Sequence, residues 1–204
     1  MQKISESSQT VAYLEKIYKQ LNKDKFNGEL EEPFITIQPT PNTYGHITNS
    51  RVWQTGEKER YEININAETL NRPIENTVAT ILHEMTHMYN IIHGIQDCSR
   101  GNTYHNKKFK EKAETVGLEI QYDKKIGWSI TKPTEELIKY IATKKWNKIP
   151  VIRNPQISAG KNGTKAKSST RKYICPACGM SVRATKEVYL ICGNCKEKME
   201  TEDN

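Results

Sequence analysis

The run His83-Glu84-Met85-Thr86-His87, which spells H-E-x-x-H, constrains the fold of this chain more than any other feature of its sequence. Pro73, ten residues before it, suits the first turn of a helix. The sequence therefore predicts a helix from Pro73 to about Asn90. Apolar residues recur through this segment at spacings of three and four, as on a buried helix face: Ile74, Val78, Ile81, Leu82, Met85, Met88 and Tyr89.

The two histidines of this run favour a metal site. On a helix, positions four apart lie about 40° apart around the axis and roughly 6 Å apart along it. His83 and His87 therefore point the same way and can hold one Zn²⁺. Glu84 follows directly, where its carboxylate can take a proton from water without binding the metal. This arrangement predicts metal-assisted peptide hydrolysis with Glu84 as the catalytic residue.

Two histidines downstream are candidates for a third ligand. His93 has the spacing of the metzincin motif H-E-x-x-H-x-x-G-x-x-H, with Asn90 in place of the glycine. No convincing Met-turn follows it, however. His105 opens a second helical pattern over residues 105–116, and a histidine at the start of a helix can reach a neighbouring helix. An exposed loop histidine is the ordinary alternative for His105, so the residues alone leave the third ligand open.

Several spaced motifs resemble the SprT-like metalloprotease family, which includes the Spartan proteases. The strongest are residues 81–87 and 99–109, the second of which reads Ser-Arg-Gly-Asn-Thr-Tyr-His-Asn-Lys-Lys-Phe. Upstream, residues 26–30 and 45–47 resemble the family's N-terminal helix and strands. The resemblance covers roughly residues 8–145.

This resemblance implies a zinc-dependent protease. It implies zinc binding by His83, His87 and His105, because His105 matches the family's third ligand and His93 does not, and it implies the catalytic role for Glu84. It also implies that the substrates are proteins attached to DNA, and that nucleic acid switches cleavage on.

A second metal site is predicted from cysteine spacing. Cys175-Pro-Ala-Cys178 and Cys192-Gly-Asn-Cys195 form two C-x-x-C pairs separated by thirteen residues. Each pair can supply two thiolates to one tetrahedral zinc ion. Four cysteines leave no open position for water, so this zinc is expected to be structural.

The surroundings of these cysteines favour a zinc ribbon over the alternative of redox or disulfide pairs. Gly179 and Gly193 supply the backbone freedom that tight metal-binding turns need, and two short strands are expected at residues 181–185 and 187–191. The N-terminus lacks the pattern of a signal peptide, and a cytosolic chain keeps its thiols reduced. Cys98 is left over as an ordinary free thiol.

Positive charge is concentrated between the two predicted metal sites. Residues 124–172 contain thirteen Lys or Arg against two Glu, a net +11, whereas the whole chain carries +7. Such a segment favours nucleic acid as a partner, bound through phosphates and largely blind to sequence. A solvated basic linker with aromatic side chains in the core is the alternative, and residues 158–169, which are short of large apolar side chains, are expected to be flexible. Four aromatic side chains could stack on exposed bases: Trp128, Tyr140, Trp146 and Tyr173.

The order of expected elements predicts an α+β fold. It consists of a zincin-like metalloprotease domain, with helices and a small β-sheet, at residues 8–150, a basic flexible linker at 151–171, and a small Cys₄ zinc ribbon at 172–200. No stretch is apolar enough to span a membrane. The remaining expected elements are a helix at 8–23, strands at 34–37, 44–48 and 60–65, and a last helix opening near 131–136 with Thr131 or Thr134 as its cap.

The leading hypothesis is a DNA-associated zinc metalloendopeptidase that cleaves DNA-bound or DNA-crosslinked proteins, a role in DNA repair. It requires one catalytic and one structural Zn²⁺, and a location in the cytoplasm or on the nucleoid. The alternatives are a general intracellular peptidase, a non-enzymatic nucleic-acid-binding zinc protein, and a regulator that acts through protein contacts. Three side chains are candidates for stabilising the oxyanion: Tyr44, His46 and Tyr104.

Overall fold

The computed structural model describes residues 5–154 and 171–201, and these fall into two compact units, each with its own core. The first unit contains helices and small sheets, and the second is a three-stranded sheet beside a cluster of four cysteines. The predicted flexible segment at 158–169 lies outside the described residues. Of the helices in the described ranges, none has the length and hydropathy needed to span a bilayer.

The first unit begins with a helix and a three-stranded mixed sheet. The helix α1 (Glu6–Lys25) buries Leu14, Ile17 and Leu21 at helical spacing, as the sequence predicted. In the sheet, β5 (Glu62–Asn66) lies in the centre, parallel to β1 (Phe34–Gln38) and antiparallel to β2 (Gly45–Ile47). The strands β3 (Trp53–Thr55) and β4 (Lys58–Arg60) form a separate hairpin, and the 3₁₀ turn η1 (Ala67–Thr69) follows β5.

The second half of this unit is built around another sheet, in the order β6-β7-β9-β8. Its strands are β6 (Cys98–Ser99), β7 (Tyr104–His105), β8 (Leu118–Asp123) and β9 (Gly127–Pro133). The helix α3 (Lys107–Thr115) precedes β8, and α4 (Glu135–Thr143) follows β9. The cap of α4 is Thr134, whose hydroxyl accepts from the N–H of Leu137, whereas Thr131 lies in β9.

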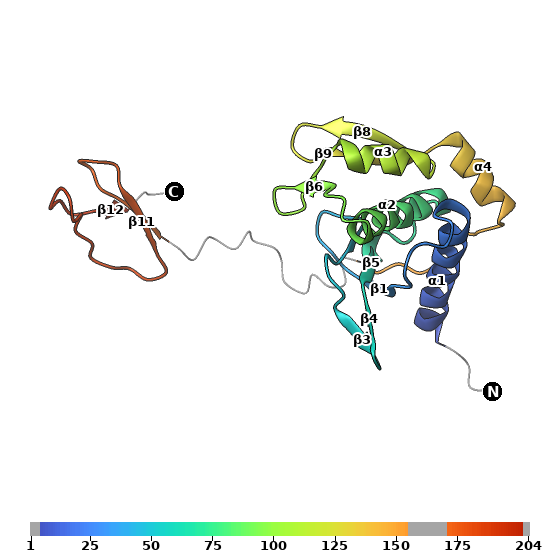
Figure 1. Ribbon diagram of the computed structural model, residues 1–204. Coiled ribbons are helices and arrows are strands. Elements are labelled where there is room, and N and C mark those ends of the chain that lie inside the picture. The colour runs from blue at the N-terminus through green and yellow to red at the C-terminus, as the bar shows by residue number, and fades with distance from the viewer. Residues whose placement is uncertain (1–4, 155–170, 202–204) are drawn as a thin grey trace. The chain divides into compact units, whose positions relative to one another are not determined.

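The helix α2 (Ile74–Ile92) lies in the middle of the unit, between α3 with the β8–β9 hairpin and the sheet that contains β5 (Figure 1). Its predicted apolar face is buried, with Val78, Leu82, Met85 and Met88 fully inaccessible. Two buried threonines satisfy their hydroxyls within the helix, since Thr80 donates to Asn76 and Thr86 to Leu82. The H-E-x-x-H segment is therefore held on a rigid core element.

The second unit contains β10 (Arg171–Ile174), β11 (Ser181–Ala184) and β12 (Glu200–Thr201), with β10 in the centre. The strand predicted at 181–185 is confirmed. The strand predicted at 187–191 is wrong, because only Ile191 there makes a bridge, to Lys198, and β11 pairs with β10 instead. Val188 and Tyr189 are exposed, so their apolar character in the sequence does not reflect a buried strand.

Three further differences from the expected elements lie in the first unit. The third predicted strand is displaced, since Arg60 ends β4 and β5 starts at Glu62. The predicted helix at 105–116 starts two residues late, because His105 ends β7 and Asn106 caps α3. The β8–β9 hairpin was not predicted, although Leu118 and Ile120 alternate with polar residues in β8, and its pairing has a register shift between Gln121 and Asp123.

Candidate metal centres

The structure brings three histidines together. His83 and His87 lie one turn apart on α2, and His105 reaches them from the end of β7. The Nε2 atoms of His83 and His87 lie 3.2 Å apart, and that of His105 lies 3.2 Å from His83 and 3.0 Å from His87. These three residues, called here the histidine triad, could hold one metal ion.

His93, the other candidate for a third ligand, lies outside this group. Its ring stacks on Tyr89, its Nδ1 lies 2.8 Å from the Tyr89 carbonyl oxygen, and its Nε2 lies 3.5 Å from a carboxylate oxygen of Glu29. The geometry thus joins His105, and not His93, to the pair on α2.

Partners on the outer side of two of the rings fix their orientation. The Nδ1 atom of His87 lies 2.7 Å from a carboxylate oxygen of Asp97, which also accepts from the side-chain amide of Asn90 at 2.9 Å. The Nδ1 atom of His83 lies 2.8 Å from the hydroxyl of Thr131, which in turn donates to the carbonyl of Ser129. In both cases the proton sits on Nδ1, because the partner oxygen has to accept it.

This protonation pattern fits a metal ion. With protons on Nδ1, the Nε2 atoms of His83 and His87 present lone pairs and cannot hydrogen-bond to each other. Two such acceptors about 3 Å apart repel each other, and a cation between them would remove that repulsion. Four ligands at Zn–N distances of 2.0–2.1 Å around a tetrahedral zinc would lie roughly 3.3 Å from one another, close to the separations in the triad. The donor atoms therefore suit zinc, whereas the identity of the metal stays a prediction.

The backbone around His105 explains how a strand residue reaches α2. The N–H of His105 donates to the carbonyl of Ile126 at 2.9 Å, and His105 pairs with Gly127 in β9. Gly127 has a φ of 72°, and a Cβ there would collide with the carbonyl oxygen of His105. Glycine at this position lets β7 approach β9 closely enough to aim the imidazole at the other two.

Glu84 is buried next to the triad, with 5% of its surface exposed. Space for its carboxylate depends on Gly45 in β2, where a Cβ would lie 2.9 Å from Thr80 Cγ2 and from the Asn64 carbonyl oxygen and 3.4 Å from Glu84 Oε1. Burial raises the pKa of Glu84 to about 7, although His87 and the backbone N–H of Ile47 act to lower it.

The pKa values of the triad and of Asp97 favour binding of a cation. Burial, and then the neighbouring imidazoles, hold the pKa of His83 well below its usual value, and burial lowers the pKa of His105 to about 4. Burial acts to raise the pKa of Asp97, but hydrogen bonds from His87 and Asn90 outweigh it and keep the pKa below its usual value. Two neutral rings and an ionised Asp97 at neutral pH are the states that metal binding requires.

A cavity of about 260 Å³ opens over the triad and Glu84. Of the three candidates for the oxyanion, only His46 lines it, and strand alternation places the His46 ring on the opposite face of β2 from Gly45, which faces α2. The hydroxyl of Tyr104 bonds to Tyr122, and the ring of Tyr44 packs under Arg72. The geometry thus singles out none of the three.

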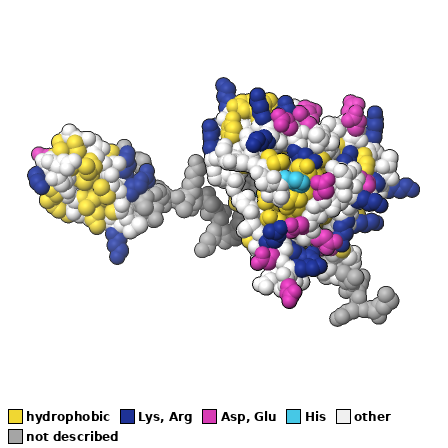
Figure 2. Space-filling view, viewed as in Figure 1, with side chains coloured by type: hydrophobic (Ala, Val, Ile, Leu, Met, Phe, Trp, Pro, Cys, Tyr) yellow, Lys and Arg dark blue, Asp and Glu magenta, His cyan; other side chains and the backbone are white. Residues whose placement is uncertain are grey.

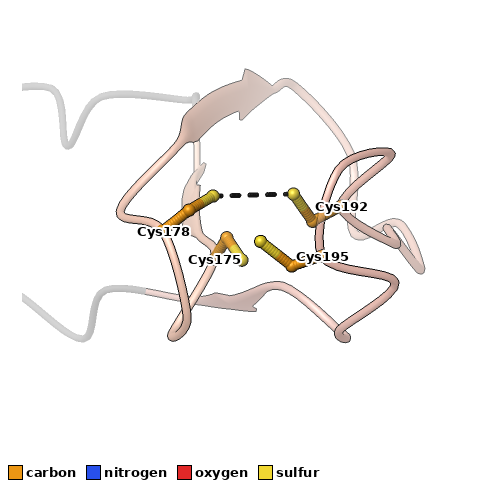
Figure 3. A group of neighbouring side chains, drawn as sticks. All are labelled: Cys175, Cys178, Cys192 and Cys195. Carbon is orange, nitrogen blue, oxygen red and sulfur yellow. Dashed lines mark hydrogen bonds between the residues drawn. The ribbon is translucent and has the colours of Figure 1, made fainter.

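The second candidate centre is the four-cysteine cluster of Cys175, Cys178, Cys192 and Cys195, whose sulfurs all lie within 4.8 Å of one another (Figure 3). All four are free thiols, and the Sγ atoms of Cys178 and Cys192 lie 3.7 Å apart. Backbone N–H groups of Cys195 and Asn194 lower the pKa of Cys192 to about 7, which favours the thiolate that a metal binds.

Each C-x-x-C pair in this cluster ends in a tight turn. In the first, the N–H of Gly179 donates to Cys175, and Gly179 has a φ of 72°. In the second, the N–H of Lys196 donates to Cys192, and Lys196 has a φ of 61°. Gly193, which was expected to supply backbone freedom to the second turn, has no positive φ, and Lys196 takes the left-handed conformation there.

The sequence singled out every member of both clusters but missed the residues that orient the histidines. Asp97 was not marked by any pattern in the sequence, and Thr131 was considered only as a helix cap, because the strand β9 that carries it was not predicted. Asn90 was seen only as a substitute for a motif glycine. Cys98 is buried, and its Sγ lies 4.0 Å from His87 Nδ1.

Comparison with known proteins supports the resemblance seen in the motifs. The model of the SprT-like family matches residues 14–126, more than half of the chain and the segment that holds the histidine triad and Glu84. No curated protein and no solved structure matches the chain. With this match over most of the first unit, and with a four-cysteine cluster in the second, the chain belongs to the SprT-like family.

Proposed function

We propose that this protein is a zinc-dependent metalloendopeptidase that associates with DNA and cleaves DNA-bound or DNA-crosslinked proteins. The observation that carries the proposal is the buried carboxylate of Glu84 beside three converging imidazoles in an open cavity. Membership of the SprT-like family supports a metalloprotease-type function. The zincin-like fold and the role in DNA repair are part of this proposal.

In this proposal His83, His87 and His105 hold the catalytic zinc, and the four-cysteine cluster holds a structural one. The catalytic zinc, when bound, would polarise a peptide carbonyl and make water a better nucleophile. The carboxylate of Glu84 accepts a proton from the attacking water and returns it to the leaving amine. Asp97 and Thr131 keep the imidazoles of His87 and His83 oriented throughout.

A row of aromatic rings beside His105 supports binding of single-stranded DNA. The hydroxyls of Tyr104 and Tyr122 lie 3.1 Å apart, and the rings of Tyr122 and Trp128 lie 5.2 Å apart. A cation covers each end, with Arg100 over Tyr104 at 4.5 Å and Lys110 over Trp128 at 4.1 Å. Aromatic side chains on which bases can stack, next to basic side chains, are typical of proteins that bind single-stranded DNA.

This row replaces part of the predicted stacking surface. Trp146 and Tyr173 are 9% and 3% exposed and belong to the two cores, so the prediction that they stack on bases is wrong. Tyr122, which the sequence did not single out, is 50% exposed. On the face in Figure 2, Lys and Arg are mixed with Asp and Glu, so the aromatic row offers a more specific contact than charge alone.

Replacing Glu84 by Gln tests the enzymatic part of the proposal. We expect cleavage of casein or histones to fall at least about 100-fold, since a general base contributes 10²–10⁴-fold, while metal content stays at two ions per chain. Glu75→Gln, on the same helix but outside the cavity, is the matched control and should cleave normally. Cleavage by Glu84→Gln protein at the wild-type rate would refute the assignment.

The role of DNA is tested by repeating the cleavage assay with and without single-stranded DNA and a chelator. Cleavage that needs both DNA and metal supports the proposal. Cleavage without DNA would indicate a general peptidase, and DNA binding without cleavage a binding module. Fluorescence anisotropy with a labelled oligo-dT should show weaker binding by Tyr122→Ala. The exposed Tyr189 of the second unit serves as a comparison, and loss in Tyr189→Ala alone would place the DNA on that unit.

A further inference from the structure

A second cleft, of about 740 Å³, opens beside the predicted catalytic centre. His83 and Glu84 line it, so a peptide bound there would pass the catalytic carboxylate. One wall is the segment that leads into β2, including Tyr44, and the other is β9, including Ile130. Tyr44 is 58% exposed and Ile130 is 39% exposed, which leaves apolar surface available to a substrate.

The guanidinium of Arg72 is held rigidly in this cleft. Its Nε donates to the carbonyl of Thr69 at 3.0 Å, and one terminal nitrogen donates to the hydroxyl of Thr80 at 2.9 Å. The Tyr44 ring lies against its face, with 4.0 Å between the guanidinium carbon and the ring centroid. The two hydrogen bonds use two of the five N–H donors of the guanidinium. Together with the ring contact, they fix the direction of the remaining donors.

Arg72 lacks a carboxylate partner among the described residues. None of the ion pairs in residues 5–154 and 171–201 includes it. Burial lowers its pKa, and only Tyr44 acts in the opposite direction. A partly desolvated cation without a counter-ion is costly. Lys132 adds a second positive charge to the cleft lining, in which Glu84 is the sole carboxylate.

The position of Arg72 relative to Glu84 determines which residue of a bound peptide would lie against Arg72. Thr80, which accepts from Arg72, lies one turn before Glu84 on α2, roughly 6 Å along the helix axis. An extended peptide advances about 3.3 Å per residue. A side chain one or two residues from the scissile bond would therefore lie against Arg72.

We propose that Arg72 selects protein substrates that carry Asp or Glu one or two residues from the cleaved bond. The open N–H donors of the guanidinium would bind the substrate carboxylate, and the apolar walls would hold the neighbouring side chains. This inference rests on the proposed peptidase activity and adds the class of substrate residue that the cleft recognises.

The test compares matched peptides built around a cleavage site mapped in casein by mass spectrometry. The peptides differ only in having Glu, Gln or Lys at the positions one or two residues from the cleaved bond. We expect wild-type protein to cleave the best Glu peptide about tenfold faster, in kcat/KM, than its Gln counterpart, a typical effect of a charged hydrogen bond. This comparison needs no variant, so it holds even if substitutions at Arg72 impair folding.

Variants then assign the preference to Arg72. Arg72→Gln should abolish it, Arg72→Glu should shift it to the Lys peptide, and Arg72→Lys should retain part of it. Arg51→Gln is the matched control, because Arg51 pairs with Glu31 outside the cleft, and its preference should equal that of the wild type. Equal cleavage of the Glu and Gln peptides by wild-type protein, or an unchanged preference in Arg72→Gln, would overturn the inference.

Binding separates this inference from the proposed activity. Labelled Glu and Gln peptides can be titrated onto Glu84→Gln protein, in which binding is measured without turnover. If wild-type protein cleaves nothing, the titration uses casein peptides that contain Glu and their Gln counterparts. About tenfold tighter binding of the Glu peptides then means that the proposed peptidase activity fails and the acidic subsite stands. If cleavage occurs but binding and kcat/KM show no preference for the carboxylate, the subsite fails and the activity stands.

Discussion

The orientation of His87 depends on a residue ten positions away in the sequence. Asp97 accepts from the Nδ1 of His87 and is itself held by Asn90, from the last turn of α2. A carboxylate behind a ligating imidazole fixes its tautomer and strengthens it as a ligand. The two histidines follow from the motif, whereas Asp97 and Thr131, which orient them, come from a loop and from β9 and are brought near only by the fold.

Replacing Asp97 by Ala is expected to weaken metal binding at the histidine triad about 10–100-fold. Cobalt titration measures this separately from the four-cysteine cluster, whose thiolates give their own charge-transfer absorption. Glu29→Ala is the control, because the Glu29 carboxylate lies beside His93 and not beside the triad, and its metal affinity should be unchanged. Equal affinity in Asp97→Ala and wild type would show that Asp97 does not support the ligand.

At the scale of elements, His105 reaches the metal site through the junction of β7 and α3. The next residue, Asn106, caps α3 by accepting from the N–H groups of Lys108 and Phe109, and its amide donates to the carbonyl of Gln96. One side chain thus starts the helix and ties it to the loop before β6. This arrangement fixes the position of His105.

Asn106→Ala should cost about 1–2 kcal/mol of unfolding free energy through loss of the cap, and it should also weaken metal binding at the triad. Thr134→Ala removes the equivalent cap of α4, far in sequence from His105, and provides the matched control. We expect a similar loss of stability there with unchanged metal affinity. Urea unfolding and cobalt titration measure the two effects, and equal loss of affinity in both variants would contradict the role of Asn106.

The helices α1 and α4 are joined by Asp24, whose carboxylate accepts from Lys144 at 2.8 Å and Tyr140 at 2.7 Å. Hydrogen bonds from Lys144, Tyr140 and Gln20 hold the pKa of Asp24 below its usual value. A lowered pKa means that the folded state favours the carboxylate. Its contribution is complete above about pH 4, the unfolded value, and is lost as the pH falls through the folded pKa.

Asp24→Asn should therefore destabilise the protein at pH 7 by at most about 1 kcal/mol, since the pair lies near the surface. The difference from wild type should shrink between pH 4 and pH 2. Urea unfolding at pH 7, 4 and 2.5, with a chelator to remove metal-linked protons, measures it. Glu15→Gln on the exposed side of α1 is the control and should show little change at any pH. A constant gap for Asp24→Asn over this range would contradict the assignment.

At the scale of the whole molecule, the two units depend on metal to different degrees. The first buries an extensive apolar core around α2, whereas the core of the second consists of Tyr173, Met199 and two of its cysteines. A core of this size cannot offset the conformational entropy that is lost on folding. A bound metal ion is therefore expected to supply most of the folding free energy of the second unit.

Chelation should therefore unfold residues 171–201 and leave the first unit folded but inactive. NMR spectra recorded before and after addition of a chelator should lose the dispersed signals of the second unit only. Cys178→Ser should have the same effect as chelation on that unit, while Cys98→Ser, the control, should leave it intact. Retained structure in residues 171–201 without metal would show that the cysteines do not need an ion.

The sequence by itself determined the features that depend on local spacing. The helix that carries His83, Glu84 and His87 follows from the 3.6-residue period of its apolar side chains, and the four-cysteine cluster follows from two close pairs. Features that depend on contacts between distant segments required the tertiary structure. They include the approach of His105 to the two helical histidines, which the family resemblance implied but which depends on Gly127 bringing β7 against β9. They also include the placement of Asp97 and Arg72, because polar side chains in loops carry no periodic signal, and of Thr131, because its strand was not predicted.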